Sequence, residues 1–97
     1  KYGDQTAPGL IFKVQVAAYM NASNYDSKHL SGLEPIEKTR LDDGITRFTM
    51  GNFTTLRAAK TLQNKAIAKG QTDAFVIMMI DGKRTYLEEL INKGIFK

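Results

Sequence analysis

The stretch GITRFTMGNF, residues 44–53, decides the fold of this 97-residue chain because it has the pattern of a central β-strand. Its side chains should alternate between the two faces of a sheet, with Phe48 and Met50 facing a core. Arg47 falls on the opposite face, which must meet water, a partner or a ligand. The preceding run Asp42-Asp43-Gly44 favours a hairpin turn, so another strand should precede it.

Three further strands are predicted around this one. The run LIFKVQVAAY at 10–19 alternates in its central part and places Lys13 and Gln15 on the face opposite its valines. The run DAFVIMMI is nearly continuously apolar, as in a strand buried on one face and partly covered on the other, and Asp81 and Gly82 end it. The four strands are predicted at residues 11–19, 36–41, 45–51 and 74–80.

The best helix signal covers residues 55–69, with Thr54 or Thr55 as the N-cap. Weaker signals predict a short helix at 26–30 and a C-terminal helix at 85–93. The long helix should pack on the apolar face of the sheet, and the residues expected to carry that contact are Leu56, Leu62 and Ile67.

An internal repeat in the sequence indicates how these elements are arranged. The segment KVQVAAYMN from Lys13 matches RFTMGNFTT from Arg47 in polarity, at an offset of 34 residues. Two such halves predict an α+β fold of the type βαββαβ, with a four-stranded antiparallel sheet, helices on one face and a short C-terminal helix. We expect residues 1–9 to be a disordered lead-in or linker and 10–97 to be the domain, with a core at 10–82 and an extension at 83–97.

Composition narrows the classes of partner. The formal charge of +4 and the pI near 9.4 favour nucleic acid, anionic lipid or a carboxylated glycan. The absence of cysteine excludes disulfides and thiolate metal sites, and no apolar run approaches the ~20 residues of a membrane span. Because the chain begins with Lys1 and shows no leader, we expect it to be part of a longer exported or anchored protein.

No enzyme signature is present in the sequence. His29 is the single histidine and has no partner at nucleophile or metal spacing, so we interpret it as a surface residue. Asp42 and Asp43 suit the turn rather than acid–base work, because adjacent turn residues diverge. The sequence therefore predicts no catalytic residue, no metal site and no cofactor.

Three motifs in this order resemble the sporulation-related repeat, or SPOR, family. They are FKVQVAAY, GITRFTMGNF and DAFVIMMIDGKR, and the match covers roughly Leu10 to Gly82. The run EKTRLDDGITRFTMGNF resembles the variant common in Bacteroidetes-type envelope proteins. The resemblance implies a non-catalytic module that binds glycan strands stripped of stem peptides, as accumulate at division septa. It also implies a place in the periplasm or envelope of a Gram-negative bacterium, with other envelope or division proteins as further partners and no nucleic acid.

The resemblance also implies where the glycan would bind. The family's contact positions fall on Gln15, Ala18, Ile45, Arg47 and Phe75, and Lys13 is expected on the same face. Ala18 and Ile45 depart from the family pattern and remove a hydroxyl and a stacking ring, and Ala17 replaces the usual glycine. Arg47 is the expected anchor, because a stripped glycan carries a lactyl carboxylate on every second sugar and arginine binds carboxylates through two parallel hydrogen bonds.

Other interpretations remain open at this stage. Phe75, Ile77 and Met79 either offer an apolar platform to a sugar ring or are covered by the C-terminal helix. The βαββαβ pattern with positive charge is also found in RNA-recognition domains, although Arg47 and Thr49 stand where those domains carry stacking aromatics. A third hypothesis is a protein-interaction or dimerisation module that uses the apolar last strand.

The predicted disorder of the N-terminal segment can be measured directly. Its glycine, proline and polar content predicts rapid amide hydrogen exchange at residues 2–6, in contrast to slow exchange in the strands. Protection of these amides comparable with that of the strands would make the segment part of the domain.

Overall fold

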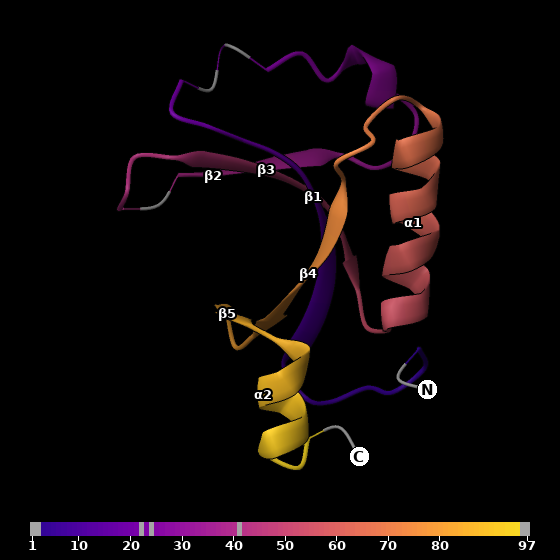
Figure 1. Ribbon diagram of the computed structural model, residues 1–97, viewed down its shortest axis with the longest axis vertical. Helices are drawn as coiled ribbons and strands as arrows, with labels where there is room; N and C mark the ends of the chain where they lie inside the picture. The colour runs from indigo at the N-terminus through magenta and orange to yellow at the C-terminus, as the bar shows by residue number, and fades with distance from the viewer. Residues whose placement is uncertain (1–2, 22, 24, 41, 96–97) are drawn as a thin grey trace.

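The computed structural model describes residues 3–21, 23, 25–40 and 42–95, which form an α+β domain (Figure 1). Lys1, Tyr2, Leu41, Phe96 and Lys97 of the predicted segments lie outside the described residues. In chain order the elements are β1 (Leu10–Tyr19), the 3-10 turn η2 (Lys28–Leu30), β2 (Ile36–Arg40), β3 (Thr46–Phe53), α1 (Leu56–Ala68), β4 (Phe75–Ile80), β5 (Lys83–Thr85) and α2 (Leu87–Asn92).

The sheet is antiparallel throughout and has the strand order β2-β3-β1-β4-β5. The α+β class and the helices on one side are confirmed, but the sheet has five strands instead of the predicted four. Asp81 and Gly82 were expected only to end a strand. Their φ angles of 50° and 81° are both positive, as in a type I′ turn, so they connect β4 to β5 in a hairpin instead.

The central strand β3 alternates as predicted. Phe48 and Met50 are buried, with exposed fractions of 2% and 0%. The strand runs two residues further than predicted because a β-bulge places Gly51 and Asn52 opposite the single residue Lys13. Gly51 has a φ of 81°, and a Cβ at that position would collide with the Phe53 ring. The bulge turns Asn52 onto the same face as Lys13, which matters for the site.

Helix α1 lies against one face of the sheet and closes the core. The Thr55 hydroxyl caps the helix by accepting the Ala58 amide at 3.3 Å. Ala59, Leu62 and Ala66 are buried against the apolar face of the strands. The prediction of Ile67 in this contact is wrong, because the small Ala66 occupies the inward position and leaves Ile67 37% exposed.

The first helix of the predicted βαββαβ pattern is reduced to the single turn η2. Only Leu30 of this turn is buried, and the Asn, Ser and Gly residues around it favour turns over a regular helix. The predicted C-terminal helix is present as α2, which packs through Leu90. No helix among the described residues is long and apolar enough to cross a membrane.

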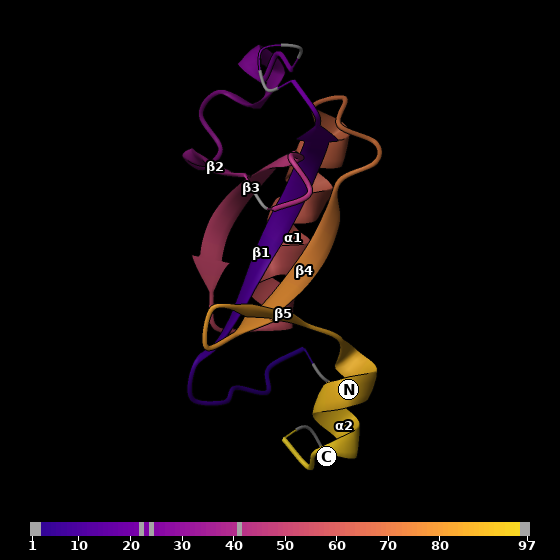
Figure 2. The same cartoon turned by 90° about the vertical axis from the view of Figure 1, so that its left-hand side faces the viewer.

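Helix α2 packs on the same side of the sheet as α1. Leu90 forms a buried cluster with Leu10, Phe12 and Ala59, all of which belong to the helix-covered side. The hypothesis that the C-terminal helix covers Phe75, Ile77 and Met79 is therefore wrong. No helix of the described residues covers the opposite sheet face, which Figure 2 shows with α1 behind the strands.

The described part of the N-terminal segment runs alongside the start of α1. The Gly3 carbonyl accepts a hydrogen bond from the Arg57 amide at 2.8 Å, and the Asp4 carboxylate accepts one from Arg57 Nε at 2.8 Å. Both side chains of this pair are at least 70% exposed, and exposed ion pairs contribute little to stability. The domain boundary near residue 10 stays a prediction for the amide-exchange measurement.

Leu62 offers the direct test of the helix packing. It is 5% exposed in the main core cluster, so Leu62→Ala should lower the free energy of unfolding by about 2–4 kcal/mol. The matched control is Asn64→Ala on the exposed side of α1, which should change it by about 0.5 kcal/mol or less. Equal effects of the two substitutions in denaturant titrations would mean that the helix face is assigned wrongly.

Candidate functional site

We call the sheet face turned away from α1 and α2 the open face (Figure 2). The strand register places both polar and apolar side chains on it. Directly paired residues of neighbouring strands project to the same face, so the strand register assigns them. The open face comprises Glu37 and Thr39 of β2, Arg47 and Thr49 of β3, Ile11, Lys13, Gln15 and Ala18 of β1, Phe75, Ile77 and Met79 of β4 and Arg84 of β5.

A groove of about 260 Å³ lies on the open face. It is lined by Gln15, Thr39, Arg47, Thr49, Ile77, Met79, Arg84 and Tyr86. Two of the six predicted site residues, Gln15 and Arg47, are thus brought together in one depression. The groove combines apolar walls, hydroxyls and two arginines, a composition suited to an elongated polar ligand with apolar ring faces.

Gln15 is the most informative residue of the groove. Its side chain is only 7% exposed, and its Oε1 atom is buried without a hydrogen-bond partner. It stands between Thr49 on β3 and Phe75 on β4. A buried carbonyl oxygen without a donor is unfavourable, and such atoms in folded proteins almost always find a partner. A ligand with an N–H or O–H group would supply the missing donor.

Arg47 is not a free cation. Its guanidinium donates to both carboxylate oxygens of Asp43, at 3.0 and 3.3 Å, and to the Ile45 carbonyl at 3.4 Å. The hydrogen bond from Arg47 is the largest cause that lowers the pKa of the Asp43 carboxyl, and the same bond raises the pKa of Arg47. Asp43 also accepts the Ile45 amide at 2.9 Å, so the turn itself fixes its carboxylate. A ligand carboxylate must compete with Asp43 for this arginine.

Lys13 is likewise held within the protein. Its ammonium donates to Asn52 Oδ1 at 2.8 Å and pairs with Glu37 at 3.3 Å, which joins β1, β2 and β3. The Asn52 amide donates to Glu37 at 3.1 Å. This bond, followed by the one from Lys13, lowers the pKa of Glu37. Lys13 lies outside the groove lining, and its visible role is to tie the three strands together.

The remaining predicted site residues surround the groove. Ala18 is exposed and pairs with Arg47, and Ile45 lies in the turn before β3 and is partly exposed. Phe75 is 43% exposed beside Gln15. None of the three lines the groove.

Arg84 and Tyr86 also line the groove, although the sequence did not predict them as site residues. Both depend on the β4–β5 hairpin, which folds the chain back so that Arg84 pairs with Met79. The signal was present in the sequence, because Asp-Gly between two strand-forming runs is a strong hairpin pattern. Thr39, Thr49, Ile77 and Met79 complete the lining from positions that the predicted alternation already placed on this face or left open.

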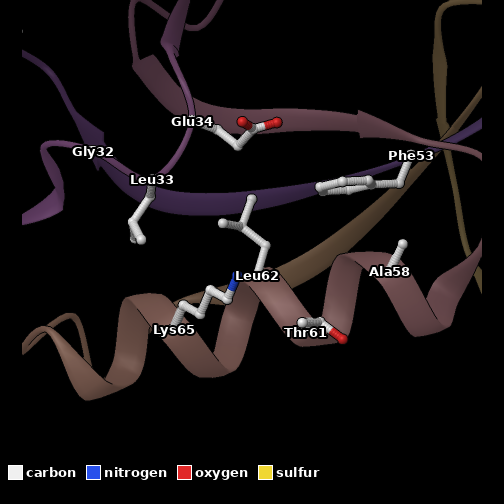
Figure 3. Close-up of a pocket in the computed structure, with 8 residues that line it drawn as sticks. All are labelled: Gly32, Leu33, Glu34, Phe53, Ala58, Thr61, Leu62 and Lys65. Atoms are coloured by element: carbon white, nitrogen blue, oxygen red, sulfur yellow. The ribbon is translucent and has the colours of Figure 1, made fainter.

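A second groove of about 420 Å³ lies on the other side of the sheet, between α1 and the segment before β2. Figure 3 shows Leu62 of α1 pointing between Leu33 and Phe53 at its floor. Its rim carries the opposite charges of Glu34 and Lys65. No unpartnered buried polar side-chain atom lies in this groove among the described residues. The open-face groove is therefore the candidate binding site.

Comparison with known proteins shows that this chain resembles a solved structure. No family model matches the sequence, and no curated protein matches it. The solution structure of the peptidoglycan binding domain of the B. subtilis cell wall lytic enzyme CwlC is 29% identical and superimposes with a TM-score of 0.62. The match covers 78% of this chain and 98% of that domain.

The contacts of Glu37 with Lys13 and Asn52 can be tested by titration of the Glu37 carboxyl. Because its pKa is lowered in the folded state, Glu37 contributes stability at pH values above the ordinary glutamate pKa of about 4.3. This contribution is lost as the pH falls through the lower, folded-state pKa. Asn52→Ala and Lys13→Met should each raise the pKa of Glu37 in an NMR titration of its carboxyl carbon, Asn52→Ala more so. Lys38→Met is the matched control, because Lys38 pairs with Phe48 on the opposite face. A Glu37 pKa unchanged by both substitutions would contradict the assigned contacts.

Proposed function

We propose that the open face binds the glycan strands of peptidoglycan as a non-catalytic module. The observation that carries this proposal is the unpartnered Gln15 Oε1 buried in the groove. Glycan hydroxyl and N-acetyl N–H groups are donors that suit it. Ile77 and Met79 provide apolar surface for the faces of sugar rings. The resemblance to the peptidoglycan binding domain of CwlC supports the same ligand class.

The proposal also concerns which glycan strands of peptidoglycan are bound. Loss of the stem peptide leaves a carboxylate on the lactyl group of every second sugar, and two arginines line the groove. We infer a preference for such stripped strands, which fits a place at the division septum. The chain would then act in the cell envelope of a Gram-negative bacterium as part of a longer exported or anchored protein. Other envelope or division proteins would be its further partners.

The alternative functions fit the open face less well. An RNA-recognition surface needs aromatic rings at exposed positions of the central strands, and Gln15, Arg47 and Thr49 stand there instead. Dimerisation by strand addition at β4 is blocked, because β5 already pairs with that strand.

Binding to purified cell-wall sacculi tests the proposal. The protein should sediment with sacculi treated with an amidase, which removes stem peptides, and less with untreated sacculi. Arg47→Ala should weaken binding by about fivefold, less than a free arginine would, because Asp43 already neutralises this side chain. Gln15→Ala should also weaken binding by about fivefold. Its melting temperature is measured alongside, because truncation of this largely buried side chain also removes packing contacts.

Two aspartates of the same turn provide the control for Arg47. Asp43→Asn keeps an oxygen for the Ile45 amide but releases Arg47, so binding to treated sacculi should tighten. Asp42→Asn changes the net charge equally without touching Arg47 and should have little effect. Sacculus binding that is insensitive to Arg47→Ala, Gln15→Ala and Asp43→Asn would move the site away from this groove. Binding to single-stranded RNA with a steep salt dependence, and none to sacculi, would replace the proposal by the nucleic-acid alternative.

A further inference from the structure

The two arginines of the groove differ in their electrostatic state. Arg47 is paired with Asp43 in two hydrogen bonds. Arg84 forms no ion pair with any acidic side chain among the described residues. Its guanidinium lies instead over the ring of Tyr86, 5.0 Å from the ring centroid. Stacking on an aromatic face holds the plane of the guanidinium while leaving its N–H donors available.

The hairpin determines where this arginine projects. Arg84 pairs with Met79, whose side chain lines the groove on the open face, whereas the neighbouring Lys83 pairs with Ile80 of the apolar cluster. Successive residues of a strand point to opposite faces, so the hairpin sends one cation to each side of the sheet. Arg84 and Tyr86 line the end of the groove formed by β4 and β5, and Arg47 lines it from β3.

We propose that Arg84, stacked on Tyr86, is the primary carboxylate-recognising subsite of the groove. This inference rests on the proposed function and refines it. A carboxylate that binds Arg84 displaces no internal partner, whereas binding to Arg47 requires the release of Asp43. The guanidinium fork donates two parallel hydrogen bonds to the carboxylate oxygens, and Tyr86, which is 54% exposed, offers its ring to the adjacent sugar. Arg84 and Tyr86 thus distinguish an acidic glycan from a neutral one.

Binding of two glycans, one with the lactyl carboxylate and one without it, tests this subsite separately from the rest of the groove. The first is a stripped oligosaccharide released from amidase-treated sacculi, and the second is a chito-oligosaccharide of equal length, which has the same N-acetylated backbone and no lactyl carboxylate. Calorimetry or NMR titration of the wild-type chain should show preferential binding of the acidic glycan. Arg84→Gln should weaken acidic-glycan binding by roughly tenfold, the scale of one charge-assisted hydrogen-bonded pair, and chito-oligosaccharide binding by a much smaller factor.

The adjacent lysine provides the matched control. Lys83→Gln removes the same charge from the same short strand but on the opposite face, so the preference for the acidic glycan should persist. Arg84→Lys keeps the charge without the planar fork and should restore binding only in part. Melting temperatures of all three variants should match that of the wild type, because both side chains are exposed.

The outcomes distinguish this inference from the proposed function. If the wild-type chain binds neither glycan, the proposed function fails and the subsite fails with it. If the wild-type chain binds the acidic glycan and Arg84→Gln behaves like Lys83→Gln, the subsite is overturned and the proposed function stands. Loss of the preference in Arg47→Ala alone would assign the carboxylate to Arg47 and would also overturn the subsite.

Discussion

The structure depends on the contact between the apolar face of β1 and helix α1. Phe12 and Val14 of β1 are fully buried, as are Ala59 and Ala66 of α1. The two alanines let the helix approach the strand closely, and burial of this surface is the main favourable term in folding. Both helices lie on this one side of the sheet, so the opposite face of the same strands remains free of helices. The candidate site lies on this opposite face.

On the open face, two of the cations are paired with other side chains of the protein. Lys13 is held by Glu37 and Asn52, and Arg47 is held by Asp43. The Lys13 contacts join β1, β2 and β3, whereas the Arg47–Asp43 pair joins β3 to the turn before it. Both neutralise a cation that the sequence places on the open face. Among the described residues that line the groove, Gln15 has a buried Oε1 atom without a hydrogen-bond partner and Arg84 has no acidic partner. The net positive charge of the chain is therefore a poor guide to the site, because the availability of each cation depends on its partner.

The similarity to the CwlC domain concerns the architecture and the class of ligand in that protein. A fold of this kind is compatible with several functions. Glycan binding is therefore inferred from individual groups of the groove, namely Gln15 Oε1 and the Arg84 guanidinium. The β4–β5 hairpin contributes directly to the groove. It covers one edge of the sheet, extends the groove and brings Arg84 and Tyr86 to its wall.

The sequence by itself determined most of the local structure, although the β4–β5 hairpin was not predicted from it. The alternation in 10–19 and 45–51, the cap at Thr55 and the apolar stripe of α1 predicted which strands and helix form and which face each strand buries. Periodicity reports such features because they depend on near neighbours along the chain. Only the tertiary structure decided which polar groups are paired. Asn52 reaches Lys13 through a bulge, Asp43 occupies Arg47, and Gln15 is left without a donor, because these relations depend on which strands lie side by side and in which register.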